Sequence, residues 1–190
     1  YSHAISAETQ TNWNGIIGKI ELQAFDRIFI RDLQVYPDAE KKIIKVVSHI
    51  SNRLKLQQNG KLGLVIGKKS EMVTSKQVSF SGNDSIITVE ASFSLGNTIS
   101  YWDEFHPTLY QLNAQLTSNA NDKVYNDVLS TSFGVRSLST KGTRFVINGR
   151  ESFIRSSVNS AEFPLTGYPS MDRQYWLKIF TTCKNYGLNG

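Results

Sequence analysis

The segment Tyr-Gln-Leu-Asn-Ala-Gln-Leu, residues 110–116, alternates apolar and polar side chains without a break. Such alternation is typical of a β-strand with one face in the core and one in solvent, because successive side chains point to opposite faces. The same pattern recurs around residues 19–24, 44–50, 62–66, 78–80 and 87–93. From about Arg27 to Arg136 the sequence therefore predicts about seven short strands without a helix, which favours a two-sheet sandwich.

Turn-forming residues separate the predicted strands. The predicted turns are Tyr36-Pro37-Asp38, Asn59-Gly60, Gly82-Asn83-Asp84 and Asn119 to Asp122. Beyond Arg136, the pair Asn148-Gly149 lies between apolar residues and predicts a tight hairpin with a type I′ turn. We assign turn formation and nothing more to this pair.

One stretch, from about Met171 to Tyr186, has the period of an amphipathic helix. Its apolar stripe contains Met171, Tyr175, Trp176, Ile179, Phe180 and Cys183. Ser170 or Asp172 can cap its start, and Gly187 can end it in the left-handed conformation. We expect Cys183 to be a small buried apolar residue. The order of strand, loop, helix and start of another strand predicts the opening of a β/α repeat that is cut short.

Composition and charge speak against several classes of function. The net charge is +5, but the Lys and Arg residues are scattered, so we expect no nucleic-acid partner. No apolar run approaches the about 20 residues that cross a bilayer, so no membrane partner is expected. A lone cysteine forms no internal disulfide, and His3, His49 and His106 lack the spacing of zinc ligands. We therefore expect neither a metal nor a cofactor.

Three groups of residues carry a family resemblance. They are Trp102 with Pro107, Leu109 and Tyr110; Phe133-Gly134-Val135-Arg136; and Phe145 to Arg150 followed by Phe153-Ile154-Arg155. In this order and spacing they resemble the family 2 glycoside hydrolases, which include β-galactosidases, β-glucuronidases and β-mannosidases. Asn12 to Gly18 resembles the last strand of the jelly-roll, sugar-binding domain that precedes the sandwich in that family.

The resemblance implies the domain organisation. Residues 1–26 would be the tail of the jelly-roll domain, 27–136 an immunoglobulin-like β-sandwich, and 137–190 the truncated start of the catalytic β/α barrel. We expect structural roles for the motif residues: core and strand-edge packing for Trp102, Leu109 and Tyr110, with Trp102 buried, a bend at Gly134, and charge-assisted hydrogen bonds from Arg136. Pro107 and Phe133 belong to the same structural motif.

One segment is expected to face substrate. The family usually shows Arg-Gly-Val-Asn-x-His at the mouth of the first barrel strand, where residues 155–162 read Arg-Ser-Ser-Val-Asn-Ser-Ala-Glu. Ser156 replaces the glycine and Ala161 the histidine, so the specificity of the parent stays open. Active sites of such barrels lie at the C-terminal ends of the strands, which makes Asn159 and Glu162 candidate substrate-binding residues.

The chain is expected to be catalytically inert by itself. Retaining hydrolysis of a glycosidic bond needs two carboxyl groups about 5 Å apart. The resemblance places both carboxyl groups in the later part of the barrel. The adjacent Asp103 and Glu104 would point to opposite faces of a strand.

The resemblance implies that the parent protein hydrolyses β-linked sugars in a periplasmic or extracellular location, while this part of it spaces the domains. One alternative is a stand-alone β-sandwich module that binds glycan or protein, and another is a basic nucleic-acid binder. The exposed apolar stripe of the helix would also allow the chain to associate with itself.

Overall fold

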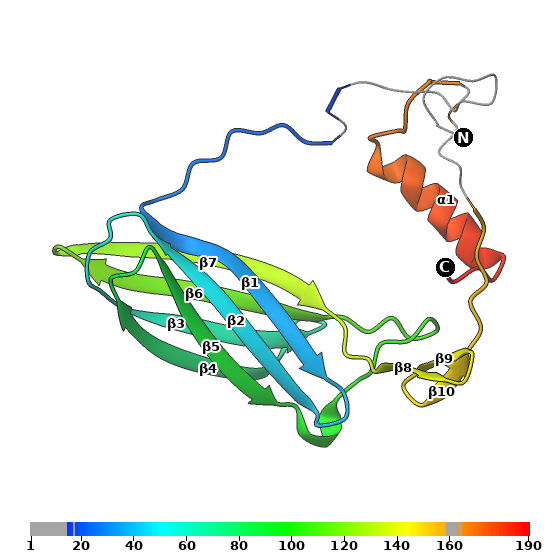
Figure 1. Cartoon of the computed structure of the whole chain (residues 1–190), viewed down its shortest axis with the longest axis horizontal. Coiled ribbons are helices and arrows are strands. Elements are labelled where there is room, and N and C mark those ends of the chain that lie inside the picture. The colour runs from blue at the N-terminus through cyan, green and yellow to red at the C-terminus, as the bar shows by residue number, and fades with distance from the viewer. Residues whose placement is uncertain (1–14, 17, 159–162, 164) are drawn as a thin grey trace. The chain divides into compact units, whose positions relative to one another are not determined.

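The computed structural model describes residues 15–16, 18–158, 163 and 165–190, and Figure 1 shows the whole chain. The chain divides into two compact units, one of which is Ala24–Ser152. The other combines the residues before position 24 with Phe153–Gly190.

The larger unit is an antiparallel β-sandwich of seven strands. They are β1 (Ile28–Asp38), β2 (Ile43–Asn52), β3 (Gln58–Lys68), β4 (Glu71–Gly82), β5 (Ile86–Ser94), β6 (Tyr110–Ala120) and β7 (Lys123–Phe133). One sheet has the order β1-β2-β5 and the other β4-β3-β6-β7. The chain thus changes sheets after β2, β4 and β5, which gives the immunoglobulin-like arrangement that the sequence predicts. The strands, at 9 to 12 residues, are longer than expected.

The core lies between the two sheets and follows the alternation of the sequence. In β6 every second residue from Tyr110 to Ala120 is buried. Ile44, Val46 and Ile50 of β2 are fully buried in the opposite sheet. Complete burial of such side chains contributes about 1.5–3 kcal/mol each. The period-two pattern therefore specifies both the strands and the face that each turns inward.

A polar network is buried within this apolar core. Asn52 of β2, Gln58 of β3 and Ser118 of β6 are fully buried. The Ser118 hydroxyl donates to Gln58 Oε1 over 3.1 Å, and Gln58 Nε2 donates to Asn52 Oδ1 over 3.4 Å. The amides of Asn52 and Gln58 also donate to the carbonyl of Leu56. The network joins the two sheets at the crossover from β2 to β3.

Two predicted turns were wrong. Asn59 and Gly60 lie inside β3, where a Cβ at position 60 would collide with the ring of Phe80. The glycine therefore makes room for an aromatic side chain of the neighbouring strand. Pro37 lies in β1, where it is tolerated because β1 is an edge strand, and the turn follows at residues 39–42.

The other two predicted turns were confirmed. β4 ends at Gly82 and β5 begins at Ile86, so the predicted Gly82-Asn83-Asp84 turn joins these strands. Between β6 and β7, Asn121 and Asp122 have φ values of 46° and 60°, which two-residue hairpin turns of type I′ require.

The strand predicted around residues 19–24 was wrong. This segment has no regular secondary structure, and Ile20 and Leu22 are exposed. Alternation by itself does not make a strand, because the backbone groups need a partner strand to bond to.

A small hairpin sheet follows the sandwich. It consists of β8 (Leu138–Lys141), β9 (Arg144–Ile147) and β10 (Arg150–Ser152) in the order β10-β9-β8. Asn148 and Gly149 join β9 to β10 with φ values of 50° and 79°, so the predicted type I′ turn was confirmed. A short 3₁₀ helix, η1 (Gly96–Thr98), precedes β6 in the sandwich.

Among the described residues of the second unit there is one helix, α1 (Arg173–Asn185). The Asp172 carboxylate accepts a hydrogen bond from Gln174 N, so Asp172 is the N-cap. At the other end Leu188 N donates to Cys183 O and Gly187 N to Lys184 O, which is a Schellman motif with Gly187 at φ 82°. Cys183 is half-buried, and the expectation of a buried cysteine was wrong because the described residues bury no side chain of α1.

Candidate functional site at the Trp102 joint

The family-like residues gather at the end of the sandwich, around Trp102. Trp102 N donates to Val135 O over 2.8 Å, which ties the segment before β6 to the segment after β7. A Cβ at position 134 would lie 3.0 Å from Trp102 Cβ and 3.1 Å from Cγ. The close approach of the indole, rather than the expected backbone bend, therefore explains Gly134, which has no positive φ.

Arg136 interacts with the indole ring. Its guanidinium carbon lies 4.9 Å from the centroid of the Trp102 ring. This is a cation–π contact, worth about 0.5–1 kcal/mol at an exposed site. We expected charge-assisted hydrogen bonds from Arg136, and the structure shows this ring contact in their place.

Asn148 connects the hairpin to the sandwich. Its Nδ2 donates to Trp102 O over 2.9 Å, and its Oδ1 accepts from Ser137 N over 2.9 Å. Its backbone N–H also donates to Ser137 O. The interpretation of Asn148 as a turn residue alone was wrong, because its side chain holds groups 46 and 11 residues away.

Behind the indole the aromatic residues of the motif pack in the core. Tyr110 is 1% exposed, and its ring stacks on that of Phe133 at 5.5 Å between centroids. The Tyr110 hydroxyl accepts a hydrogen bond from Ser100 N over 2.8 Å, which satisfies its polar end. Burial was also expected for Trp102, and there it was wrong, because Trp102 lies at the end of the sandwich and is half-buried. Leu109, for which core or strand-edge packing was expected, directly precedes β6 and is 54% exposed.

The loop between Trp102 and β6 is held by its own aspartate. Asp103 Oδ1 accepts hydrogen bonds from His106 N at 2.6 Å and Phe105 N at 2.9 Å. The bond from the His106 backbone lowers the pKa of Asp103 most, against a smaller opposing effect of desolvation. Pro107, which is exposed, forms an isolated β-bridge with Trp102. Asp103 thus organises its own loop.

The remaining candidate residues give no catalytic centre. Asn159 and Glu162, the predicted substrate-binding residues, lie outside the described residues. In the described part of the chain, no group of three or more His, Cys, Asp or Glu side chains could hold a metal ion. None of the described helices is long and apolar enough to span a membrane. The arrangement around Trp102 is a structural joint, which we call the Trp102 joint: Trp102, Gly134, Arg136 and Asn148.

Comparisons with known proteins agree on one family. The family model described as glycosyl hydrolases family 2 matches residues 28–136. A family 2 member from Bacteroides cellulosilyticus has a TM-score of 0.58 and 21% identity, over 68% of this chain and 17% of its own. A β-glucuronidase from Bacteroides uniformis has a TM-score of 0.70 and 12% identity, over 86% of this chain and 21% of its own.

A putative β-galactosidase from Bacteroides fragilis has a TM-score of 0.50 and 23% identity, over 66% of this chain and 18% of its own. No curated protein sequence matches the chain significantly. At these identities the solved structures show a shared fold. The chain spans about a fifth of the length of these solved relatives.

Proposed function

The chain belongs to family 2 of the glycosyl hydrolases, and we propose that it spaces and orients a sugar-binding domain and a catalytic domain within such an enzyme. The parent would hydrolyse O-glycosidic bonds of β-linked sugars with retention, as the resemblance implies. A β-galactosidase-like or β-glucuronidase-like substrate is proposed from the names of the solved relatives.

The Trp102 joint is the observation that supports a spacer role most. A spacer transmits orientation only if the chain leaves it at a fixed angle. Here two hydrogen bonds of the Asn148 side chain hold the hairpin that follows the sandwich. The Arg136 guanidinium and the close contact at Gly134 hold the indole of Trp102, the residue whose backbone carbonyl accepts one of these bonds. The compact unit accordingly continues through the hairpin to Ser152.

The second unit supports the proposed start of a β/α barrel. Asn189 N donates to Arg155 O over 2.9 Å, and Arg155 N donates to the Asn189 side chain over 2.8 Å. Two segments without regular secondary structure thus meet, and α1 lies between them in the sequence. A strand, a helix and a neighbouring strand are the repeating unit of a β/α barrel.

The proposed domain boundaries remain 1–26, 27–136 and 137–190, with the hairpin as the connection between sandwich and barrel. In this arrangement Asn159 and Glu162 would follow the first barrel strand and face the substrate. We assign no catalytic residue to this chain.

Hydrolysis assays test the proposal. The full-length protein that contains this chain is incubated with aryl β-glycosides of galactose, glucuronic acid, glucose and mannose. We expect release of the aryl group from at least one of them by the full-length protein and none by residues 1–190 alone, because two carboxyl groups are needed. Turnover by the pure 190-residue chain, or none by the full-length protein, would contradict the proposal. An inactive full-length protein would favour the stand-alone binding module.

A further inference from the structure

The outer face of the four-stranded sheet has an unusual composition. Its outward positions on the central strand β6 carry amides and a hydroxyl: Gln111, Asn113, Gln115, Thr117 and Asn119. β7 adds Asn126, Ser130 and Ser132 on the same face, together with the exposed Val124 and Val128. Among the outward positions of β3, β6 and β7, all of them described, Lys61 is the one charged side chain. A solvated protein surface normally carries about 25–35% charged residues of both signs.

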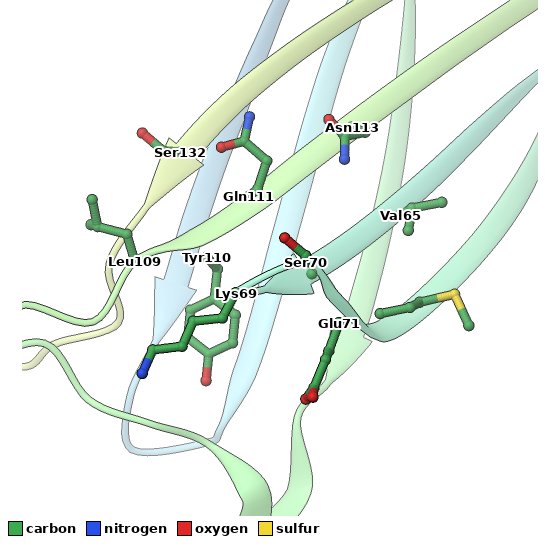
Figure 2. A pocket seen from close by; sticks show the side chains of 11 residues that line it. Val65, Lys69, Ser70, Glu71, Leu109, Tyr110, Gln111, Asn113 and Ser132 are labelled. Carbon is green, nitrogen blue, oxygen red and sulfur yellow. The ribbon is translucent and has the colours of Figure 1, made fainter.

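A pocket opens at one end of this polar face (Figure 2). It has a volume of about 470 Å³, and Gln111, Asn113 and Ser132 contribute polar groups to its lining, as does the Lys69–Glu71 segment. Val65 and Met72 contribute apolar surface, and Met72 is 69% exposed. Ser130 donates to Asn113 Oδ1 over 2.7 Å, so the orientation of this amide is fixed and its Nδ2 hydrogens can serve a ligand.

The hairpin that closes the pocket is held in a costly conformation. Lys69 and Ser70, which join β3 to β4, have φ values of 49° and 68°. For residues with a Cβ this region costs about 1–2 kcal/mol each, and turns of this type normally use Asn and Gly. Both residues line the pocket. Lys69 and Glu71, one basic and one acidic residue, both line this end, so the lining of the pocket has no excess of either charge.

The outer face of β3 is open beside the pocket, at Gly63, which is not one of the residues that line the pocket; we call the pocket and this open surface together the groove. Gly63 lies one position further along the outer face from Val65 and pairs with Gln115 of β6 and Gln77 of β4. Its φ is not positive, and a Cβ there would meet only the Gln115 carbonyl oxygen, at an ordinary 3.7 Å. The fold of the described chain therefore gives no reason for glycine in the middle of a central strand, where it weakens the sheet. A ligand that approaches the backbone closely would supply the reason.

We propose that this groove, formed by Gly63, Val65, Gln111, Asn113 and Gln115, binds a neutral oligosaccharide. An amide offers a donor and an acceptor together, and so matches the neighbouring hydroxyls of a sugar ring. Val65 and Met72 can pack on the apolar C–H face of the ring. Without an aromatic platform the affinity is weak, with Kd in the millimolar range. The proposal does not depend on the proposed spacer role.

An NMR titration of the 190-residue chain tests the proposal. The probes are cellohexaose, mannohexaose and xylohexaose, with hexagalacturonate as the charged comparison. We expect at least one neutral probe to shift the side-chain amides of Gln111, Asn113 and Gln115 and the backbone amides of Gly63 and Gly67. No saturable shift with any neutral probe, shifts confined to other surfaces, or binding of hexagalacturonate alone would overturn it. The titration involves no hydrolysis, so its failure leaves the proposed enzyme class untouched.

Two substitutions at Gly63 separate binding from folding. Gly63→Ala should leave the urea midpoint unchanged or slightly raised, since its methyl group has room. Gly63→Gln fills the groove and should weaken binding by at least about tenfold. Gln115→Ala, at an exposed position, removes one amide without filling the groove and should weaken binding as well. Unchanged affinity in both Gly63→Gln and Gln115→Ala would overturn the assignment of the site.

Discussion

Replacing Gln58 by alanine should strongly destabilise the sandwich. Gln58 is fully buried between the sheets, and its amide accepts from Ser118 and donates to Asn52. Its removal leaves the Ser118 hydroxyl and Asn52 Oδ1 buried without these partners, at about 1–3 kcal/mol for each group. The 3.4 Å bond to Asn52 is long, so its loss belongs at the lower end of this range. The Leu56 carbonyl keeps its bond from Asn52 Nδ2.

The free energy of unfolding should therefore fall by about 3–5 kcal/mol once the lost packing of the side chain, about 0.8 kcal/mol per CH₂, is included. This is a large part of the about 5–15 kcal/mol that stabilises a typical domain. Urea unfolding followed by far-ultraviolet circular dichroism measures the change, which should shift the midpoint and leave the slope m unaltered. Gln77→Ala, at an exposed position of β4, is the matched control and should change stability by less than about 0.5 kcal/mol.

A Gln58→Leu/Ser118→Ala double variant should recover part of the loss, because both ends of one hydrogen bond become apolar. A loss for Gln58→Ala no greater than that of the Gln77→Ala control would refute the reasoning. The polar network would then add no net stability, because water would satisfy the same groups equally well.

Three further predictions concern the end of the sandwich. Trp102→Ala should lower the free energy of unfolding by about 2–3 kcal/mol, less than the about 3–5 kcal/mol typical of a fully buried tryptophan. Urea unfolding measures the change, with Phe105→Ala, at a position that is 74% exposed, as the control. Gly134→Ala should lower the free energy of unfolding by about 1–3 kcal/mol, because the added methyl group overpacks against the Trp102 indole. Equal stability of Gly134→Ala and Gly63→Ala would contradict the close contact between Gly134 and Trp102. The pKa of Asp103 is lowered in the folded chain, so its stabilising effect is present at neutral pH and is lost as the pH falls below 3.8 through the lowered value. Carboxyl ¹³C NMR titration should show this lowered midpoint, and replacement of His106 by proline, which removes the donating N–H, should raise it.

The fold follows from local patterns where each side chain meets its neighbours in a regular way. Alternation predicts β5 and β6 because each has a partner strand and a buried face. Caps predict the ends of α1 because Asp172 and Gly187 act on groups within a few residues. Alternation fails at residues 19–24, where the described chain supplies no partner strand.

The joint could not be predicted, because its causes are distant in the sequence. Gly60 and Gly134 resemble turn or bend residues, but the aromatic rings of Phe80 and Trp102 explain them. Asn148 satisfies its turn locally, and nothing in the local sequence indicates that its amide reaches the Trp102 carbonyl. Only the three-dimensional packing shows which of several uses a glycine or an asparagine has.

The central claim is that the hairpin β8-β9-β10 is rigidly attached to the sandwich through Asn148. Backbone ¹⁵N relaxation on the 190-residue chain and on Asn148→Gly measures this most directly. Glycine keeps the left-handed turn conformation but removes both side-chain hydrogen bonds. In the unmodified chain we predict order parameters for residues 138–152 equal to those of the sandwich strands, about 0.85. In Asn148→Gly the hairpin values should fall while those of β6 and β7 stay unchanged. A hairpin that is already mobile in the unmodified chain, or equally ordered in both proteins, would contradict the account.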